Sequence, residues 1–364
     1  MKNHIKYIDM ARGFAICGIA YSHFISIVSI SKPDLSTSLG IRFFSVFHVP
    51  IFFIIRGQVL AYHGELKLTR EFVLKRVKSI MLPYFAFSLL NIIYAYIDMT
   101  IHNIPNVIIE YKRNMIHTLT FYGISVLWFL PMMFLGELWF VLLKSNAAKS
   151  AAAKVICLLM IGTYMVSPYL EVKPEGCIWM QSMGLLILNY ILVVLFRSFL
   201  ALFYIWIGYQ TLHFFQKLKE QKKKEIISTA TFLGAGSILL PYVRTIEIHY
   251  LKLGGNRGLL SFVCTICFSF GFLLLFQIIE NRSIKWLSFL GVNSLWIMCS
   301  HKDFGIPNWC MQVGNFFVSV SPRAKNYVFW IAAFGALLLI ESGISLLCNR
   351  FVILCKRKKG KASG

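Results

Sequence analysis

Charged residues are scarce in this sequence. Only 14% of its 364 residues are charged and 57% are hydrophobic, and the mean hydropathy is +0.67. An ordinary soluble domain carries about 25% charged residues. Acidic residues are few, with 15 Asp and Glu against 37 Lys and Arg. This composition excludes a soluble domain and predicts a chain that lies mainly in a lipid bilayer.

Signatures of several other protein classes are also missing. No serine lies in a Gly-x-Ser-x-Gly motif, so a separate serine nucleophile is not indicated. Cys264 and Cys267 have CxxC spacing, but no His or carboxylate lies beside them, so we expect no metal. Most of the nine cysteines lie in apolar stretches, which argues against a disulfide framework. No inverted repeat and no Pro/Gly/Ser-rich linker divides the chain.

Long apolar runs predict an all-α polytopic membrane protein with about ten transmembrane helices. A helix of roughly 20 apolar residues crosses a hydrocarbon core about 30 Å thick, and most of the runs approach this length. The predicted spans are Ile8 to Ile30, Phe43 to Tyr62, Ile80 to Thr100, Ser125 to Leu143, Val155 to Leu170, Ser198 to Phe215, Ile226 to Val243, Gly258 to Ile279, Trp286 to His301 and Tyr327 to Leu347.

The basic residues predict the orientation of the chain. The formal net charge is +22, but the Lys and Arg residues form short clusters between apolar runs, so we expect no nucleic-acid partner. Ten spans with a cytoplasmic N-terminus place 23 of the 37 Lys and Arg inside, 11 outside and three within spans. Both termini are therefore predicted to be cytoplasmic. We expect one membrane domain over residues 1–349 and a basic tail over 350–364 that contacts anionic membrane lipid.

The stretch Cys177 to Phe196 is apolar enough to be an eleventh span. An eleventh span would invert every later loop and would put the lysine-rich segment Lys217 to Lys224 outside. We therefore predict that this stretch is interfacial or re-entrant, with Arg197 at its junction with the next span.

The first predicted span carries three ionisable residues. Arg12 and His23 are 11 positions apart, and at about 100° per residue they project from the same helix face, roughly 16 Å apart along the axis. Asp9 lies three residues before Arg12 and can pair with it at the cytoplasmic boundary. Because ionisable groups are costly in a bilayer, this shared face is the first candidate functional site.

Other charges within or beside the spans allow more than one interpretation. Glu137 lies among apolar residues and is expected to serve in structural pairing rather than in catalysis. Arg56 either extends the polar track beside Arg12 or pairs with Glu137. Arg197 either contacts substrate or extends to the membrane interface, and His301 is interpreted as an interfacial histidine.

The segment Tyr7-Ile8-Asp9-Met10-Ala11-Arg12-Gly13, with ten residues between its arginine and His23, resembles the opening of the acyltransferase-3 family of membrane O-acetylases. The resemblance spans nearly the whole chain, and Arg197 to Gly208 is most similar to the fucose 4-O-acetylase-like branch. The other similar segments are His48-Val49-Pro50-Ile51-Phe52-Phe53, Arg76-Val77-Lys78-Ser79-Ile80-Met81-Leu82-Pro83-Tyr84, Leu127-Trp128-Phe129-Leu130-Pro131 and Leu290-Gly291-Val292-Asn293-Ser294-Leu295 with His301.

The resemblance implies transfer of an acetyl group from cytoplasmic acetyl-CoA to a glycan or lipid-linked sugar, in what we expect to be a bacterial cytoplasmic membrane. It also implies donor binding at Arg76, where Lys75 and Lys78 either add positive charge or only set topology. The chain departs from the family pattern at Ser79, where a second arginine is common, and at Arg56, where a small residue is usual.

O-acetylation needs a base for the acceptor hydroxyl and a cation or hydrogen-bond donor for the charge that develops on the thioester oxygen. His23 is the predicted base, and Arg12 is the predicted cation for the donor phosphates or carbonyl. Two other functions use similar residues. A proton-coupled transporter would explain Arg, His and Glu within spans but predicts inverted repeats. A glycan flippase or polymerase would bind the acceptor without acetylating it.

Overall fold

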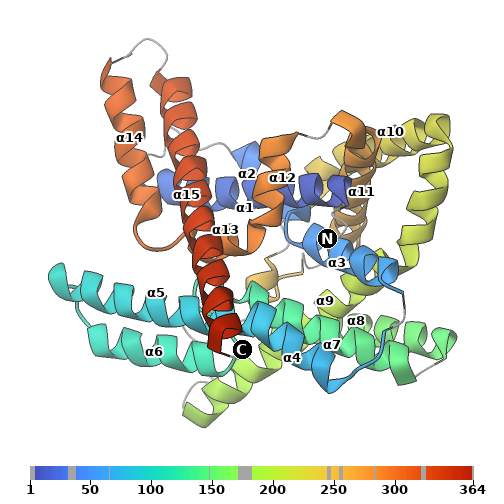
Figure 1. Cartoon of the computed structure of the whole chain (residues 1–364), viewed down its shortest axis with the longest axis horizontal. Helices are drawn as coiled ribbons and strands as arrows, with labels where there is room; N and C mark the ends of the chain where they lie inside the picture. The colour runs from blue at the N-terminus through green and yellow to red at the C-terminus, as the bar shows by residue number, and fades with distance from the viewer. Residues whose placement is uncertain are drawn as a thin grey trace. The chain divides into compact units, whose positions relative to one another are not determined.

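The computed structural model confirms the all-α fold class (Figure 1). In the part of the chain that it describes, no strand forms, and the β-type pairing amounts to a single bridge between Glu247 and Lys252. The described residues are 5–31, 38–64, 66–146, 148–170, 183–243, 247–253, 257–282, 284–320 and 325–362.

The chain forms two compact units. The first contains Met1–Ile41 and Ser283–Gly364, and the second contains Arg42–Arg282. The helices of the first unit are α1 (Lys6–Ser31), α12 (Lys285–Val292), α13 (Ser294–Ser300), α14 (Ile306–Val320) and α15 (Lys325–Ala362).

The second unit contains the larger set of helices, including most of α2 (Ser38–Phe47). A π-helix, η2 (Val77–Met81), and three short 3₁₀ segments, η4 (Leu240–Tyr242), η5 (Ile248–Tyr250) and η7 (Glu280–Arg282), accompany the α-helices. The α-helices are α3 (Pro50–Tyr62), α4 (Arg70–Arg76), α5 (Leu82–Ile101), α6 (Val107–Leu119), α7 (Phe129–Asn146), α8 (Lys149–Leu170), α9 (Met183–Glu220), α10 (Lys222–Leu239) and α11 (Gly258–Ile278).

Helix length and composition identify a polytopic membrane protein. Seven segments of the described chain are long and apolar enough to cross a membrane. They are Lys6–Ile30, Arg42–Tyr62, Arg70–Ile101, Lys149–Leu170, Gly184–Glu220, Gly258–Ile278 and Tyr327–Val352.

Some predicted spans are not single helices, and Phe43 to Tyr62 is divided between α2 and α3. The stretch Trp286 to His301 is divided into α12 and α13 at Asn293. The side-chain amide of Asn293 donates to the Phe289 carbonyl at 2.8 Å, and its own oxygen accepts from Asn349 of α15 at 2.5 Å. The prediction of one continuous helix was wrong because this side chain bonds to the local backbone and to another helix.

Helix α9 corrects the interpretation of the stretch before Arg197. From Met183 to Glu220 the chain is one helix of 38 residues, about 57 Å long at about 1.5 Å per residue. The described part of the stretch is therefore continuous with the next predicted span, and Arg197 lies within the helix rather than at a junction. Residues 177–182 lie outside the described part of the chain.

Glycines allow three helices of the second unit to pack closely. A Cβ atom on Gly57 of α3 would overlap the α9 backbone at Ile205, and one on Gly208 of α9 would overlap the α3 backbone at Ile54. Gly136 of α7 makes a similar close contact with α9. Small residues of this kind let helix backbones approach within a membrane. Helices α3 and α7 are thereby both held against α9.

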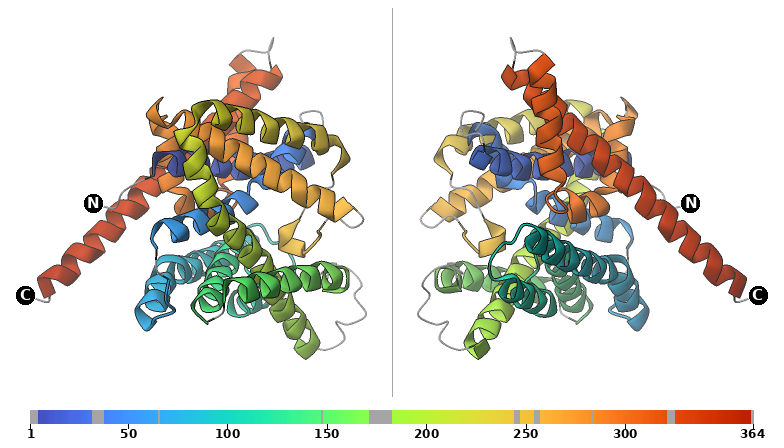
Figure 2. Two further views of the ribbon diagram at one scale, coloured as in Figure 1. Left: turned by 90° about the vertical axis from the view of Figure 1, so that its right-hand side faces the viewer. Right: turned by 90° about the vertical axis from the view of Figure 1, so that its left-hand side faces the viewer.

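The first unit combines a glycine contact with an aromatic core. A Cβ atom on Gly13 of α1 would overlap the α12 backbone at Leu287, and one on Gly291 would overlap the carbonyl of Asp9. Elsewhere α1 packs against α14 and α15 through a core that includes Phe24. Helix α14 runs beside the first part of α15, whose later turns extend beyond it (Figure 2).

The glycine contacts predict which small substitutions the fold tolerates. Gly57→Ala should lower the free energy of unfolding by about 1 to 3 kcal/mol, because the added methyl group meets a backbone carbonyl that cannot rotate away. Gly162→Ala is the matched control, since open space surrounds that helical glycine and alanine favours a helix. Thermal unfolding in detergent measures both. Equal unfolding temperatures for the two variants would contradict the close contact.

Candidate active site

The predicted catalytic residues of the first unit lie on one uninterrupted helix. Asp9, Arg12 and His23 all belong to α1, whose 26 residues contain no break. Asp9 is buried, whereas Arg12 and His23 are half-buried. The contact between Gly291 and the Asp9 carbonyl brings α12 against the turn that carries Asp9 and Arg12. The ion pair between these two side chains remains a prediction.

A second histidine lies against His23. The ring centroids of His23 and His301 are 5.3 Å apart, with 39° between the ring planes. His301 is 1% exposed, so it is buried in the protein, and its place at the membrane interface stays a prediction. Its Nδ1 lies 2.8 Å from the Ile297 carbonyl oxygen, which requires the proton on Nδ1 and makes Nε2 the acceptor nitrogen of the neutral ring.

The helix before His301 is tied to α15 by polar side chains. Ser300 donates to the carboxylate of Glu341 at 2.5 Å, and Glu341 is fully buried. One α-helical turn earlier, the Trp296 indole donates to Asn349 at 3.0 Å. These contacts position the end of α13 and therefore His301. Sequence reasoning missed Glu341, although a carboxyl group within the span Tyr327–Val352 is itself a signal.

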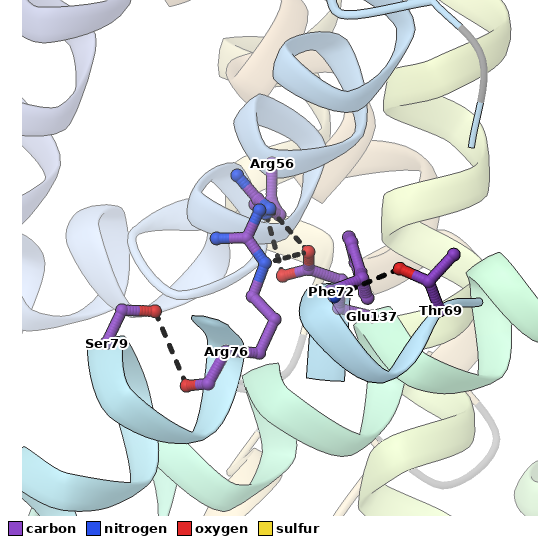
Figure 3. A network of polar contacts seen from close by, with 6 residues as sticks. All are labelled: Arg56, Thr69, Phe72, Arg76, Ser79 and Glu137. Carbon is purple, nitrogen blue, oxygen red and sulfur yellow. Dashed lines mark hydrogen bonds and ion pairs between the residues drawn. The ribbon is translucent and has the colours of Figure 1, made fainter. Parts of the chain in front are cut away.

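In the second unit a buried carboxylate binds two arginines (Figure 3). Arg56 donates from Nε to Glu137 Oε2 at 2.8 Å and from Nη2 to Oε1, which makes a bidentate pair. Arg76 reaches the same carboxylate from another helix, with its Nε 2.7 Å from Oε1. Of the two alternatives for Arg56, the structure shows the pair with Glu137.

The segment around Arg76 is organised by local contacts. The Thr69 hydroxyl caps α4 by accepting from the Phe72 N–H at 3.2 Å. The Arg76 guanidinium lies over the Phe72 ring, 5.2 Å from its centroid, and the π-helix begins at the next residue. The Ser79 hydroxyl donates to the Arg76 carbonyl (Figure 3). A π-helical turn of this kind is frequent at functional sites.

The two neighbouring lysines do not join this network. Lys75 and Lys78 are exposed, and neither makes an ion pair with a described residue. Their proposed contact with the donor therefore remains a prediction, as does that of Arg76.

Arg197 has a different environment from the one expected. It is 1% exposed and does not extend to an interface. It donates to the backbone carbonyls of Tyr122, at 2.8 Å, and of His249. Its guanidinium also lies 4.4 Å from the Tyr122 ring centroid and 5.7 Å from that of Trp128. Arg197 thus holds the turn at Tyr122 and the 3₁₀ segment η5 against α9.

The imidazole of His117 lies beside the Tyr122 ring, which packs against Arg197. The His117 ring is 4.7 Å from the Tyr122 ring. Burial, followed by the positive charges of Arg113 and Arg197, lowers the pKa of His117 to about 4. His117 is therefore uncharged at neutral pH, which avoids a second cation next to Arg197.

The helical fold and the long apolar segments define a polytopic membrane protein that buries charged groups in its interior. The profile of the acyltransferase-3 family, described as an acyltransferase domain, matches residues 5–346. The chain therefore belongs to the acyltransferase-3 family, and the family resemblance of the sequence is confirmed. No curated protein and no solved structure matches the chain.

The shared carboxylate predicts a strong effect of removing its charge. Glu137→Gln should lower the free energy of unfolding by about 3 kcal/mol, because two partly buried guanidinium groups lose their common counter-ion. The double variant with Glu137→Gln and Arg56→Met should recover part of the lost free energy of unfolding, because only one of the two buried cations then lacks a counter-ion. Denaturant unfolding in detergent checks both variants.

The matched control for this measurement is Glu220→Gln. Glu220 is exposed at the end of α9, and its substitution should change stability little. If Glu137→Gln were as stable as this control, the carboxylate would not be the counter-ion of the two arginines.

Proposed function

We propose that this acyltransferase moves an acetyl group from acetyl-CoA to a hydroxyl of a glycan or lipid-linked sugar. The observation that supports it best is the position of His23, which shares an unbroken helix with Arg12 and lies against a buried second histidine. A base and a fixed cation on one helix are the two groups that acyl transfer requires.

In the proposed reaction the acceptor oxygen bonds to the acetyl carbon as the carbon–sulfur bond breaks. His23 takes the hydroxyl proton, which then passes to the departing sulfur and gives the free thiol of CoA. Arg12 stabilises negative charge on the thioester oxygen or on the donor phosphates. His301 restrains the ring of His23 by packing against it. Arg76, Lys75 and Lys78 are proposed to bind the donor.

We further propose that the enzyme lies in a bacterial cytoplasmic membrane with both termini inside. The asymmetry of Lys and Arg residues supports this orientation. A cysteine placed at Lys223 should then resist a membrane-impermeant maleimide in intact cells and react after permeabilisation. A cysteine at Lys112, which is exposed on α6 in a segment predicted to be external, should react in intact cells. The reverse pattern would overturn the orientation.

The catalytic proposal predicts the effects of two substitutions. His23→Ala should lower the rate of acetyl transfer by roughly 100-fold or more, because a general base contributes about this much. Arg12→Lys should also lose most activity, since an ammonium keeps the charge but not the planar guanidinium. The assay is transfer of radiolabel from acetyl-CoA to a cell-envelope glycan by purified protein.

His213→Ala is the matched control for this assay, because His213 is exposed on α9. It should keep the rate of the unmodified protein. Near-normal transfer by His23→Ala at an equal protein level would contradict the role of His23. Absence of label transfer by the unmodified protein, with transport or flipping of a glycan instead, would contradict the acetyltransferase proposal itself.

A further inference from the structure

The network around Glu137 has more positive than negative charge. Two guanidinium groups face one carboxylate, and neither arginine pairs with another acidic residue in the described part of the chain. The side chains of Arg56 and Arg76 are only 14% and 18% exposed. Because unbalanced charge is costly at such low exposure, the network favours an additional anion.

The unused nitrogens of the two arginines can bind this anion. Glu137 engages Nε and Nη2 of Arg56 and Nε of Arg76. No other hydrogen bond to a described residue engages Nη1 of Arg56 or the two terminal nitrogens of Arg76, so these nitrogens can serve another acceptor. A guanidinium has five N–H donors in a rigid planar fork that matches the oxygens of a phosphate group.

The carboxylate also holds the two guanidinium groups in place. They come from separate helices, α3 and α4, and meet at one point on α7 (Figure 3). Without a carboxylate between them, the two cations would repel each other. Glu137 thus allows two arginines to converge on one small region and face a common ligand.

The position of the pair in the chain agrees with a cytoplasmic ligand. Arg56 lies six residues before Tyr62, the last residue of α3, or about 9 Å along the helix. The short connection from Tyr62 to Arg70 is predicted to be cytoplasmic, and acetyl-CoA is a cytoplasmic molecule with several phosphate groups.

We propose that Arg56 and Arg76 together bind a phosphate group of the CoA donor, with Glu137 as their fixed counter-ion. The proposal rests on the proposed acetyl-CoA donor and adds Arg56 to the residues that bind it. A phosphate group could also come from an anionic lipid, so the experiment separates these two sources.

The test is equilibrium binding of radiolabelled CoA to the purified full-length protein in detergent without added lipid. Arg56→Gln should raise the dissociation constant at least about tenfold, because it removes one of two charged ligands of the phosphate. Arg56→Lys should bind with intermediate affinity, since it keeps the charge and the pair with Glu137 but loses the planar fork. Arg113→Gln is the control, because Arg113 is exposed on α6 and forms an ion pair with Glu110 of the same helix, and it should bind CoA normally.

A parallel measurement uses phosphatidylglycerol in place of CoA. If Arg56→Gln weakens retention of this lipid and leaves CoA binding unchanged, the donor-site proposal is overturned in favour of a lipid site. Unchanged CoA binding by Arg56→Gln in a protein that binds CoA also overturns it, while the acetyl-CoA proposal stands. Failure of the unmodified protein to bind CoA overturns the proposed donor itself. Unfolding temperatures establish that each variant is folded, and Arg56→Lys supplies the comparison if Arg56→Gln is not.

Discussion

Glu137 can be ionised in an apolar interior only with cations beside it, and this requirement links three segments of the second unit. Arg56 of α3 and Arg76 of α4 both reach the carboxylate on α7. Arg56 can reach the Glu137 carboxylate because α3 and α7 both pack closely against α9 at glycines. The ion pairs therefore depend on the backbone contacts, because the arginines would not reach the carboxylate if the helices were farther apart.

The first unit also combines close backbone contacts with polar side-chain contacts, and there the two together position a histidine. Close backbone contact at Gly13 and Gly291 fixes α1 against α12, and hydrogen bonds from Ser300 and Trp296 fix α13 against α15. Together they bring a buried His301 to the ring of His23. An enzyme gains from such restraint, because a base whose ring cannot rotate freely is already oriented for proton transfer.

Several features could be predicted from local sequence because they depend on a helix's own residues. The all-α class, the continuous first helix and the acyltransferase family follow from apolar run length and from the motif around Arg12 and His23. The sequence-based predictions were wrong where contacts between residues far apart in the sequence determine the structure. The break at Asn293 depends on Asn349, and the burial of Arg197 depends on Tyr122 and His249, which lie far from it in the sequence.

The sequence by itself determined that this protein lies in a membrane, that it is an acyltransferase and that charged residues stand within its spans. Composition and apolar run length carry the membrane location, because the cost of exposing apolar residues to water acts on each segment alone. The acyltransferase family is indicated by the resemblance of the motif around Arg12 and His23. Only the tertiary structure decided that Arg56 pairs with Glu137, that Arg76 shares the same carboxylate, and that α9 is one long helix. An ion pair such as Arg56–Glu137, whose residues are 81 positions apart, depends on how the helices pack, and the packing is set by glycine contacts that no single helix reveals.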